Sequence, residues 1–408
     1  MEMAVQMSLL VINCGTSSVK TSLFLCHTQS LERFLEGHFK NIFSSQPVLE
    51  IKGPEIKKNI AMNSASSYVK SIEKTIEQFE LEGFSPASLK GIGHRVVHGG
   101  EKYTQSVVIT PEVEKQLQTL SNLAPLHNPP ALEGIACASR LFPQILQAAV
   151  FDTAFHATLP LKASIYPIPW ELAEKHKIKR YGFHGIAHAF SWKKYAETFG
   201  HEKERHKVIT VHLGSGCSLA AIDQGTSVDT SMGFTPLDGV MMATRCGELD
   251  PAIMSYLCDK ESKSPGEILA LFNQQSGLLG VSGKTADMQE LLKMTQSDDR
   301  AKLAIEMFIY RILKKIGSFI AVLGGIDALI FSGGIGENAP EIRRRLAEGL
   351  LWYGVSLDDG KNDACSQLTP GEIRCIGREN SSIKVCVVSS DENLFIAQEM
   401  SKLLKSQV

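Results

Sequence analysis

The sequence lacks an excess of charge of either sign. Its 408 residues include 42 Lys and Arg against 44 Asp and Glu, which gives a net charge of −2 at pH 7. A chain so balanced has no long-range attraction to nucleic acid or to an anionic membrane, so we expect neither as a partner. One basic run stands out, Arg343, Arg344 and Arg345, and we interpret it as the solvated face of a helix.

Paired cysteine spacing and long apolar runs are also missing. The nine cysteines form no CxxC motif, and the N-terminus shows neither a basic segment nor a secretory cleavage site. These features predict a reducing, cytoplasmic setting. The most apolar stretch, residues 319–331, is interrupted by Gly324, Gly325 and Asp327, which excludes a membrane span. The whole chain is 43% hydrophobic and 21% charged, a composition typical of a globular protein of two or three domains.

Two short Gly- and Ser-rich turns stand out against this ordinary composition. Apolar β-type runs at residues 9–12 and 208–211 enter turns at residues 13–20 and 212–218, and further β-type runs follow at residues 22–26 and 219–223. Backbone amides and hydroxyls in tight glycine turns suit phosphate oxygens. The repeated unit predicts a duplicated nucleotide-binding core, in which we expect Cys14 and Cys217 to be small apolar fillers.

Strand-like and helix-like patterns alternate along the rest of the chain. Pro129 and Pro130 open a helix that continues to Arg140, and helical patterns also cover residues 69–79, 186–199 and 298–323. The strand-like runs lie at residues 147–151, 328–331 and 383–388, and the last is followed by a turn and a helix from residue 392. This alternation predicts an α/β protein, with a boundary near residue 155.

Two glycine motifs look like familiar nucleotide sites. Residues 277–285 resemble a Walker A loop, but Leu278 stands where the motif needs a glycine, five places before Gly283. Residues 334–339 match GxGxxA between a strand and a helix, with Asp358 about twenty residues later, as a Rossmann site requires. Too little chain follows for a dinucleotide domain. We therefore interpret this second motif as a nucleotide turn at a helix N-terminus in another fold.

The densest chemistry lies between residues 91 and 252. Arg95 ends a predicted strand beside a glycine turn, where a guanidinium could hold a carboxylate or phosphate through two hydrogen bonds. His127 and His184 lie in loops bounded by Pro or Gly. Taken singly, such an arginine is more commonly a surface ion pair, and such a histidine more commonly structural. The polar loop at residues 229–251, by contrast, is hard to explain by packing alone.

These blocks, taken in order, resemble the acetokinase (acetate kinase) family over nearly the whole chain. The matching blocks are residues 13–20, 93–100, 124–130, 151–160, 181–188, 212–218, 229–251, 334–338 and the helix that begins at Glu392. The resemblance implies two similar ribonuclease H-like (actin-like ATPase) α/β domains around a nucleotide cleft. They would comprise residues 1–154, with the helix at 392–408 packing back on them, and residues 155–391. The resemblance also implies a homodimer.

The resemblance further implies a role for individual residues. The catalytic groups would be Arg95, Asp152, His184 and Arg245, with the arginines beside the transferring group and His184 as a hydrogen-bond donor. Asn13 and Glu392 would hold Mg²⁺, for which Mn²⁺ is expected to substitute. The acid substrate would be lined by Arg95, Val97, Leu126, His127, Phe183 and Pro236. ATP or ADP would contact Thr16, Ser18, Lys20, His212, Leu213, Gly214, Ser215, Gly216, Asp287, Met288, Gln289, Gly334, Ile335, Gly336, Glu337 and Asn338.

The residue types agree with the chemistry that the resemblance implies. A carboxylate nucleophile, two arginines, a histidine donor and Mg²⁺ suit in-line phosphoryl transfer, because positioning and charge neutralisation supply most of the catalysis. We predict reversible transfer from ATP to acetate, giving acetyl phosphate and ADP. The alternatives are a kinase of propionate or another short-chain acid, and a non-catalytic actin-like ATP-binding module. The module would have no need for all four catalytic groups.

Some positions depart from the family's usual residues or roles. Ser215 replaces a usual Asn, Gln289 a usual Arg and Asp238 a usual Glu, and the first two predict an altered nucleotide affinity or base preference. The family usually gives Asp152 the role of proton acceptor. A carboxylic substrate with a pKa of about 4.3 is already ionised at neutral pH, so we assign Asp152 to Mg²⁺ or its waters. Val97 matches the position beside the acetate methyl, and its β-branched side chain predicts acetate rather than propionate.

Overall fold

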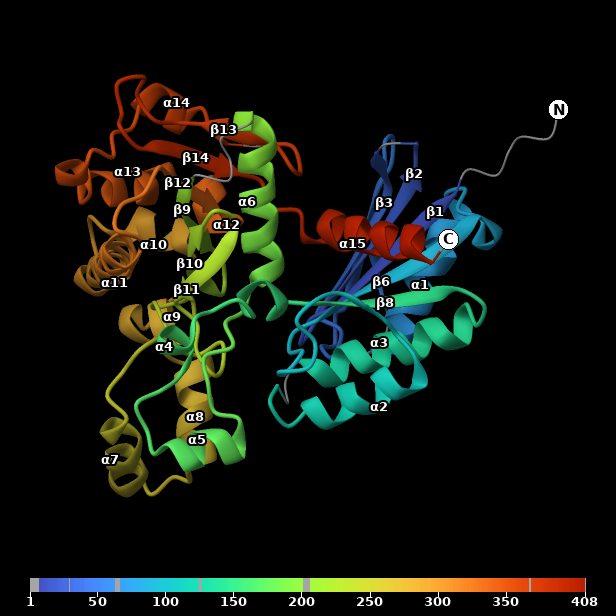
Figure 1. Ribbon diagram of the computed structural model, residues 1–408, viewed down its shortest axis with the longest axis horizontal. Coiled ribbons are helices and arrows are strands. Elements are labelled where there is room, and N and C mark those ends of the chain that lie inside the picture. The colour runs from blue at the N-terminus through green and yellow to red at the C-terminus, as the bar shows by residue number, and fades with distance from the viewer. Residues whose placement is uncertain are drawn as a thin grey trace. The chain divides into compact units, whose positions relative to one another are not determined.

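The computed structural model describes residues 7–28, 30–62, 67–124, 127–200, 206–366 and 368–407. The chain divides into two compact units (Figure 1). Unit 1 comprises Met1–Phe155 and Asp391–Val408, and unit 2 comprises His156–Ser390. Within the described ranges, no helix combines the length and the apolar character needed to cross a bilayer.

Unit 1 is built on a mixed eight-stranded sheet. Its strands are β1 (Ser8–Cys14), β2 (Val19–Cys26), β3 (Leu31–Lys40), β4 (Val48–Lys52), β5 (Lys57–Ala61), β6 (Leu89–Val96), β7 (Val107–Val108) and β8 (Leu146–Phe151). They are ordered β5-β4-β3-β2-β1-β6-β8-β7. The central strands β1, β6 and β8 are parallel, and β2 to β5 extend the sheet by antiparallel pairing. The carboxyl ends of β1, β6 and β8 therefore share one edge of the sheet.

Helices cover both faces of this sheet. They are α1 (Tyr68–Leu81), α2 (Pro111–Leu120), α3 (Asn128–Leu141) and α15 (Glu392–Ser406), with a short 3-10 turn, η1 (Pro86–Ser88). On one face, Ile12 and Ile92 share a hydrophobic core with Ile72 of α1. On the other face lies α15, drawn in red beside the blue strands in Figure 1. There, a Cβ atom on Gly91 would lie 2.6 Å from Met400, and one on Gly93 would lie 2.6 Å from Ile396. Glycine at both positions thus permits the close approach of α15.

Unit 2 repeats the central part of the same strand order. Its strands are β9 (Lys207–Leu213), β10 (Cys217–Asp223), β11 (Thr226–Thr230), β12 (Ala328–Ser332), β13 (Ile373–Cys375) and β14 (Lys384–Val388). They are ordered β11-β10-β9-β12-β14-β13. The antiparallel set β11-β10-β9 continues into the parallel strands β12 and β14, as β3-β2-β1 continues into β6 and β8.

The helices of unit 2 are more numerous. They are α4 (Leu161–Ser164), α5 (Trp170–His176), α6 (Gly185–Phe199), α7 (Ala252–Glu261), α8 (Pro265–Gln274), α9 (Gly277–Ser282), α10 (Met288–Met294), α11 (Asp299–Leu323), α12 (Gly333–Asn338), α13 (Pro340–Glu348) and α14 (Asp359–Asp363). A 3-10 turn, η4 (Leu351–Tyr353), also belongs to this unit, and another, η2 (Ala154–His156), includes the last two residues of the first segment of unit 1 and the first residue of unit 2. The strands lie between α6 and α11 in Figure 1. Asp298 caps α11 by accepting a hydrogen bond from Ala301 N at 2.8 Å, which fixes where this long helix begins.

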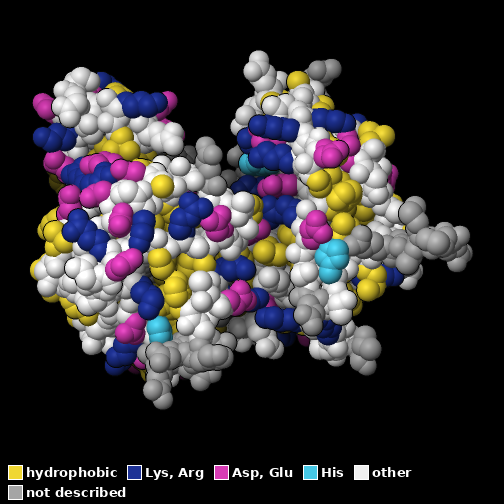
Figure 2. All heavy atoms as spheres, turned by 90° about the horizontal axis from the view of Figure 1, so that it is seen from above, with side chains coloured by type: hydrophobic (Ala, Val, Ile, Leu, Met, Phe, Trp, Pro, Cys, Tyr) yellow, Lys and Arg dark blue, Asp and Glu magenta, His cyan; other side chains and the backbone are white. Residues whose placement is uncertain are grey.

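The α/β fold predicted from the sequence is confirmed. The two Gly/Ser turns connect β1 to β2 and β9 to β10, and the predicted strand-like runs correspond to β8, β12 and β14. The Walker-like motif begins in α9 rather than after a strand, in agreement with its rejection. Figure 2 shows acidic and basic side chains interspersed over the visible face, as the balanced composition leads one to expect.

Candidate functional site

Three predicted site residues meet where parallel strands of unit 1 end. Asn13 lies at the end of β1 and Arg95 at the end of β6, and Asp152 directly follows β8. Ile12 pairs with His94 and Val96 with Phe151, so the three side chains lie at the same sheet edge. Arg95 is two residues beyond Gly93 on the same strand, and alternation places it on the face that α15 covers.

Arg95 and Asp152 form a bidentate ion pair. Arg95 Nε donates to Asp152 Oδ1 at 3.1 Å, and Nη2 donates to Oδ2 at 2.6 Å. Burial by itself would lower the pKa of Arg95, but the charges of Asp152 and Glu392 outweigh this effect and raise it. Burial raises the pKa of Asp152, and Arg95 opposes that shift. Because a guanidinium remains protonated, the buried carboxyl is held as one half of an ion pair.

Glu392 brings a second carboxylate to the same arginine from the first turn of α15. Its Oε2 lies 3.5 Å from Arg95 Nη1, and the side chain is half-buried. The donor set near this edge thus comprises the Asn13 amide and the carboxylates of Asp152 and Glu392, all oxygen donors of the kind that Mg²⁺ prefers. Over the described ranges, no group of three or more His, Cys, Asp or Glu side chains is arranged as a metal site. That is compatible with Mg²⁺, which commonly takes only one or two carboxylates beside water and phosphate oxygens.

The first Gly/Ser turn presents polar groups to solvent. Gly15 N donates to Ser18 O at 2.8 Å and closes the turn. Tyr68 donates its hydroxyl hydrogen to Thr16 O at 2.7 Å, which anchors the turn to α1. The side chains of Thr16 and Lys20 are exposed and Ser18 is half-buried, so all three remain accessible to a ligand.

The loop after Arg95 is held by reciprocal hydrogen bonds. His98 N donates to Asn128 Oδ1, and Asn128 Nδ2 donates to His98 O, each at 3.1 Å. These bonds join the loop that carries the buried Val97 to the start of α3, where His127 is the N-cap residue. Leu126 lies outside the described residues.

A chain of hydrogen bonds positions His184 in unit 2. Ser218 Oγ lies 2.9 Å from His184 Nδ1 and 2.8 Å from His188 Nε2, and His188 Nδ1 lies 2.7 Å from Thr210 Oγ1. Burial, reinforced by nearby histidines, lowers the pKa of His188 well below its ordinary value, so this ring is neutral at pH 7. Because a hydroxyl has one hydrogen, Ser218 can donate to one ring while accepting from the other. His184 itself has φ of 56°, an uncommon left-handed conformation, at the N-cap of α6.

His212 and Arg245 lie near His184. The rings of His184 and His212 have centroids 5.0 Å apart, and His212 Nδ1 lies 3.1 Å from Ser332 Oγ at the end of β12. A Cβ atom on Gly216 would lie 3.0 Å from His184 Cε1 and 3.5 Å from Arg245 Nη1, so both side chains crowd the second Gly/Ser turn.

Arg245 has a different environment from Arg95. Its Nη1 donates to Pro236 O at 3.2 Å, and in the described part of the chain it forms no ion pair with a carboxylate. Burial lowers its pKa, which means that the charged guanidinium is incompletely solvated. A bound anion would relieve that penalty. Phe183, the other residue that the resemblance assigns to the acid site from this unit, is fully buried.

Three of the predicted nucleotide segments line one cavity of unit 2. The cavity has a volume of about 400 Å³ and lies at the second Gly/Ser turn and α12. Its lining includes Gly214, Ser215, Asp287, Met288, Gln289, Gly334, Ile335 and Asn338. Five predicted contacts from these segments are not among the lining residues: His212, Leu213, Gly216, Gly336 and Glu337. A space of this size, bordered by two glycine turns, can accept a phosphorylated ligand.

Buried polar contacts hold α12 in place. Gly333 has φ of +79°, and a Cβ atom there would lie 2.7 Å from Leu213 O, so glycine is required. Glu337 Oε1 accepts hydrogen bonds from Gly333 N at 3.0 Å and Ser390 N at 3.1 Å. Glu337 was predicted to contact the nucleotide, but its carboxylate fixes the start of α12 to the segment that carries Ser390.

Arg343 corrects one prediction. The run at residues 343–345 was expected to form a solvated face, but Arg343 is fully buried. Its Nη1 donates to Gly336 O and Glu337 O, each at 2.8 Å, and its Nε donates to Asn362 Oδ1 at 2.8 Å. The guanidinium satisfies carbonyl groups at the end of α12, and this requirement outweighs the cost of burying a cation.

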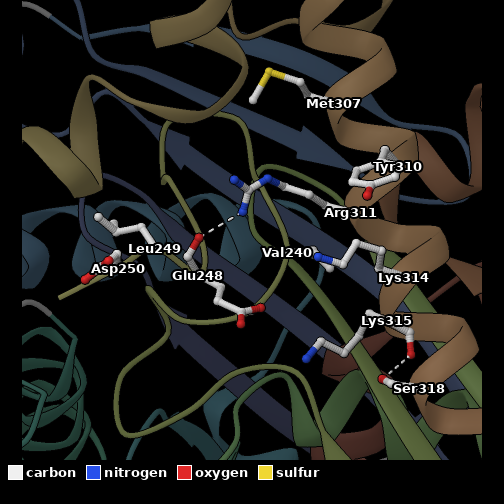
Figure 3. A pocket seen from close by; sticks show the side chains of 11 residues that line it. Val240, Glu248, Leu249, Asp250, Met307, Tyr310, Arg311, Lys314, Lys315 and Ser318 are labelled. Carbon is white, nitrogen blue, oxygen red and sulfur yellow. Dashed lines mark hydrogen bonds between the residues drawn. The ribbon is translucent and has the colours of Figure 1, made fainter. Parts of the chain in front are cut away.

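A larger cavity, of about 750 Å³, contains none of the predicted site residues. Figure 3 shows Arg311, Lys314 and Lys315 of α11 along one side of it and Glu248 and Asp250 on the other. Arg311 Nη1 donates to Glu248 O at 2.8 Å. The turn at Gly214, the turn at Gly334, the hydrogen-bonded histidines and Arg245 lie elsewhere in unit 2. We therefore place the candidate site of this unit at the cavity of about 400 Å³, although it is the smaller of the two.

The geometry adds three residues that the sequence interpretation did not assign. Ser218 and His188 position His184, and Asn128 fixes the loop that carries Val97. His188 follows His184 by four residues, a spacing that places both on one side of a helix, and this was the available signal. Ser218 and Asn128 could be found only from the strand register and the loop conformation.

Comparison with known proteins gives a consistent result over the full chain. A family model described as the acetokinase family matches residues 8–398. An acetate kinase of Chloroherpeton thalassium is 42% identical over 416 residues, covering 96% of this chain and 98% of the relative. The crystal structure of Porphyromonas gingivalis acetate kinase matches with a TM-score of 0.89 and 34% identity, over 98% of this chain and 100% of that one. A propionate kinase structure from Francisella tularensis also gives a TM-score of 0.89, with 38% identity over 97% of this chain and 99% of that one.

Proposed function

This chain belongs to the acetokinase family, and from that premise we propose that it transfers the γ-phosphoryl group of ATP to acetate, reversibly, giving acetyl phosphate and ADP. The observation that carries the proposal is Arg245, a half-buried cation without a carboxylate partner in the described chain, beside the turn that carries Gly216. A guanidinium in this state is suited to the charge of a transferring phosphoryl group. A non-catalytic nucleotide-binding module would have no use for it.

We place the nucleotide phosphates against the turn at Gly214 and the start of α12 at Gly334, in the cavity of about 400 Å³. The backbone of both segments approaches a ligand closely because glycine has no side chain there. The exposed Ser215 and Gln289 line the same cavity. We expect these two to set nucleotide affinity and base preference.

In the transfer step, a carboxylate oxygen of the acid forms a bond to the γ-phosphorus while the bond from that phosphorus to the β–γ bridging oxygen breaks. The acid enters already ionised, so no proton needs to be removed. His184 donates a hydrogen bond to the transferring group, and Arg245 neutralises its charge. Arg95 takes the same kind of role, held in orientation by Asp152.

Asp152 is poorly placed to act as a general base, because both of its oxygens accept hydrogen bonds from Arg95. We therefore keep its assignment to the metal or the metal's waters, through lone pairs that Arg95 leaves unused. Asn13 and Glu392 would hold Mg²⁺, or Mn²⁺ in its place. The ion's contribution would be to neutralise charge on the phosphate oxygens.

Acetate is proposed ahead of propionate on the basis of Val97. This side chain is buried, and its β-branched shape limits the space next to it. The propionate kinase among the matching structures makes propionate the second candidate. An additional methylene is worth about 0.8 kcal/mol, so we expect propionate to be a weak substrate rather than an inactive one.

We also propose a homodimer in the cytoplasm, with small-molecule substrates and without nucleic acid or membrane partners. Sedimentation equilibrium of the purified protein tests the first of these expectations. A monomer at micromolar concentration would contradict it.

A coupled assay with ATP, Mg²⁺ and a panel of acetate, propionate, butyrate and glycerol tests the function itself. We expect acetate to be preferred over propionate by roughly 10- to 200-fold in kcat/KM, and glycerol to be inactive. Val97→Ala should move the ratio toward propionate, mainly through KM. Val355→Ala, at another buried valine, should leave the ratio unchanged. Absence of activity with every acid would refute the proposed function, and an unmoved ratio in Val97→Ala would refute the assignment of the pocket.

A further inference from the structure

Two cysteines of unit 2 lie side by side on neighbouring strands, outside the site described above. Cys375 ends the edge strand β13, and Cys386 lies in the middle of β14. Their Sγ atoms are 3.2 Å apart. Ten residues separate them in the sequence, so no short cysteine motif announces the pair.

The strand register places the two residues directly opposite each other. Cys375 pairs with Cys386 across the antiparallel ladder. Ile376 N donates to Val385 O and Ser389 N donates to Glu372 O, each at 2.9 Å, which identifies this pair as non-hydrogen-bonded. Cα atoms in such a pair are about 4.5 Å apart, within the range that a disulfide spans. The thiols could therefore be joined while the strand pairing is kept.

The two thiols have complementary properties. Cys375 is exposed and Cys386 is buried. The hydrogen bond from Cys386 lowers the pKa of Cys375, and the charges of Lys384 and Lys361 act in the same direction. The same hydrogen bond, together with burial, raises the pKa of Cys386. An exposed sulfur with thiolate character next to a second thiol is the arrangement found in reactive cysteine pairs.

Another pair of thiols in the chain provides an internal contrast. Cys14 and Cys137 are both buried in unit 1 and are close enough to interact electrostatically. Burial raises the pKa of Cys14 to about 12, so its thiolate is scarce at neutral pH. Proximity alone therefore does not confer reactivity, and the exposure of Cys375 distinguishes the two pairs.

We propose that Cys375 and Cys386 form a reversible intramolecular disulfide when the protein meets a peroxide. The Cys375 thiolate attacks one oxygen of hydrogen peroxide; an S–O bond forms, the O–O bond breaks, and hydroxide leaves and is protonated to water. The Cys386 sulfur, after losing its proton to solvent, attacks the Cys375 sulfenic acid. The S–S bond forms, the S–O bond breaks, and the second oxygen leaves as water. Two electrons pass from the sulfurs to the peroxide, and a small thiol such as dithiothreitol reverses the reaction.

The test treats the folded, full-length protein with hydrogen peroxide, quenches it, and counts free thiols in denaturant alongside peptide mass mapping. The wild type should lose two of its nine thiols, together with two hydrogen atoms of mass, through a cross-link between the peptides that contain Cys375 and Cys386. Dithiothreitol should restore both thiols. These readouts do not depend on kinase activity, so failure here is separate from failure of the proposed function.

Three variants sharpen the result. Cys375→Ser, at an exposed position that should not affect folding, should lose no thiols at the same peroxide concentration. Cys386→Ala should retain a sulfenic acid on Cys375 that dimedone captures. Cys258→Ser, which removes a half-buried thiol on α7, should form the cross-link as the wild type does. The proposal is overturned if wild-type Cys386 stays reduced while Cys375 oxidises further, or if other cysteines react first.

Discussion

The two units have the same central strand order, but the site arginine of each unit has a different set of partners. In unit 1, Arg95 lies between two carboxylates and donates twice to Asp152. In unit 2, Arg245 is half-buried, and within the described residues its hydrogen-bond acceptors are the Pro236 carbonyl and the sulfur of Met242. The first arginine is fixed in place by the protein. The second retains binding capacity for an anion.

This difference suggests that the two arginines contribute differently to stability and to activity. An arginine whose charge is matched within the protein is held in one orientation, and an arriving anion adds less to its stabilisation. An arginine left with an unrelieved burial penalty gains the most when an anion arrives, and that gain is greatest when negative charge is spread over a transferring phosphoryl group. Activity should therefore depend most on Arg245, and stability most on Arg95.

The largest effect is expected for Arg245→Ala. Loss of the guanidinium should reduce kcat/KM by about 10³-fold or more. The free energy of unfolding of this variant should be unchanged or slightly higher, because a half-buried and unmatched cation has been removed. Steady-state kinetics and urea denaturation measure the two quantities, with Arg311→Ala as the control from the other cavity. Near-normal activity would remove the main support for the proposed function.

Arg95→Ala should lower activity and, unlike Arg245→Ala, should also destabilise the protein. It leaves Asp152 buried without its cation, which should cost about 3–5 kcal/mol of unfolding free energy. Without Arg95, burial and the nearby charge of Glu392 both raise the pKa of Asp152, so its folded pKa should exceed the unfolded value of about 3.9, and stability should fall as pH rises above that value. Arg95→Ala/Asp152→Ala should recover most of the stability but not the activity. Additive losses in the double variant would show that the pair is not coupled.

Much of this architecture follows from local sequence patterns. The apolar runs that precede residues 13 and 212 are continuous because both faces of these central strands are buried. Asp298 and the Pro129–Pro130 pair mark helix starts through capping and fixed φ. The candidate site could be anticipated where polar residues lie at or directly after strand ends, as Asn13, Arg95 and Asp152 do.

Other features depend on distant parts of the chain and were beyond local patterns. Arg343 and Arg344 are adjacent and chemically identical, yet Arg343 is buried against α12, whereas Arg344 is half-buried and forms ion pairs with three carboxylates. Only the packing of α13 against α12 and α14 separates them. Likewise, Ser218 lies between two histidines because β9 and β10 set the register. The Cys375–Cys386 pair could not be predicted from local sequence either, because only the pairing of β13 with β14 brings the two residues together.

A comparison of variants at Arg343 and Arg344 tests whether the hydrogen bonds from Arg343 to α12 stabilise the protein and its nucleotide site. Arg343→Ala should leave buried carbonyl groups unsatisfied and lower the unfolding free energy by about 3 kcal/mol, and it should raise the KM for ATP. Arg344→Ala removes ion pairs to Glu341, Asp359 and Asp363, all solvent-exposed, and should cost less than about 1 kcal/mol. Denaturant unfolding and ATP titrations separate the two. Equal effects would mean that the buried hydrogen bonds contribute nothing specific.

The smallest effect concerns how His184 is held. Ser218→Ala removes the hydroxyl between His184 and His188, so His184 should lose its orientation and kcat should fall by about tenfold, equivalent to ~1.4 kcal/mol, with little change in the KM for acetate or ATP. Ser227→Ala is the matched control, since it removes a buried hydroxyl 2.8 Å from the ring of His156 in the same unit. That variant should keep its kcat. A similar fall in both would indicate general loosening of the unit, whereas a fall confined to Ser218→Ala would assign the positioning of His184 to this hydroxyl.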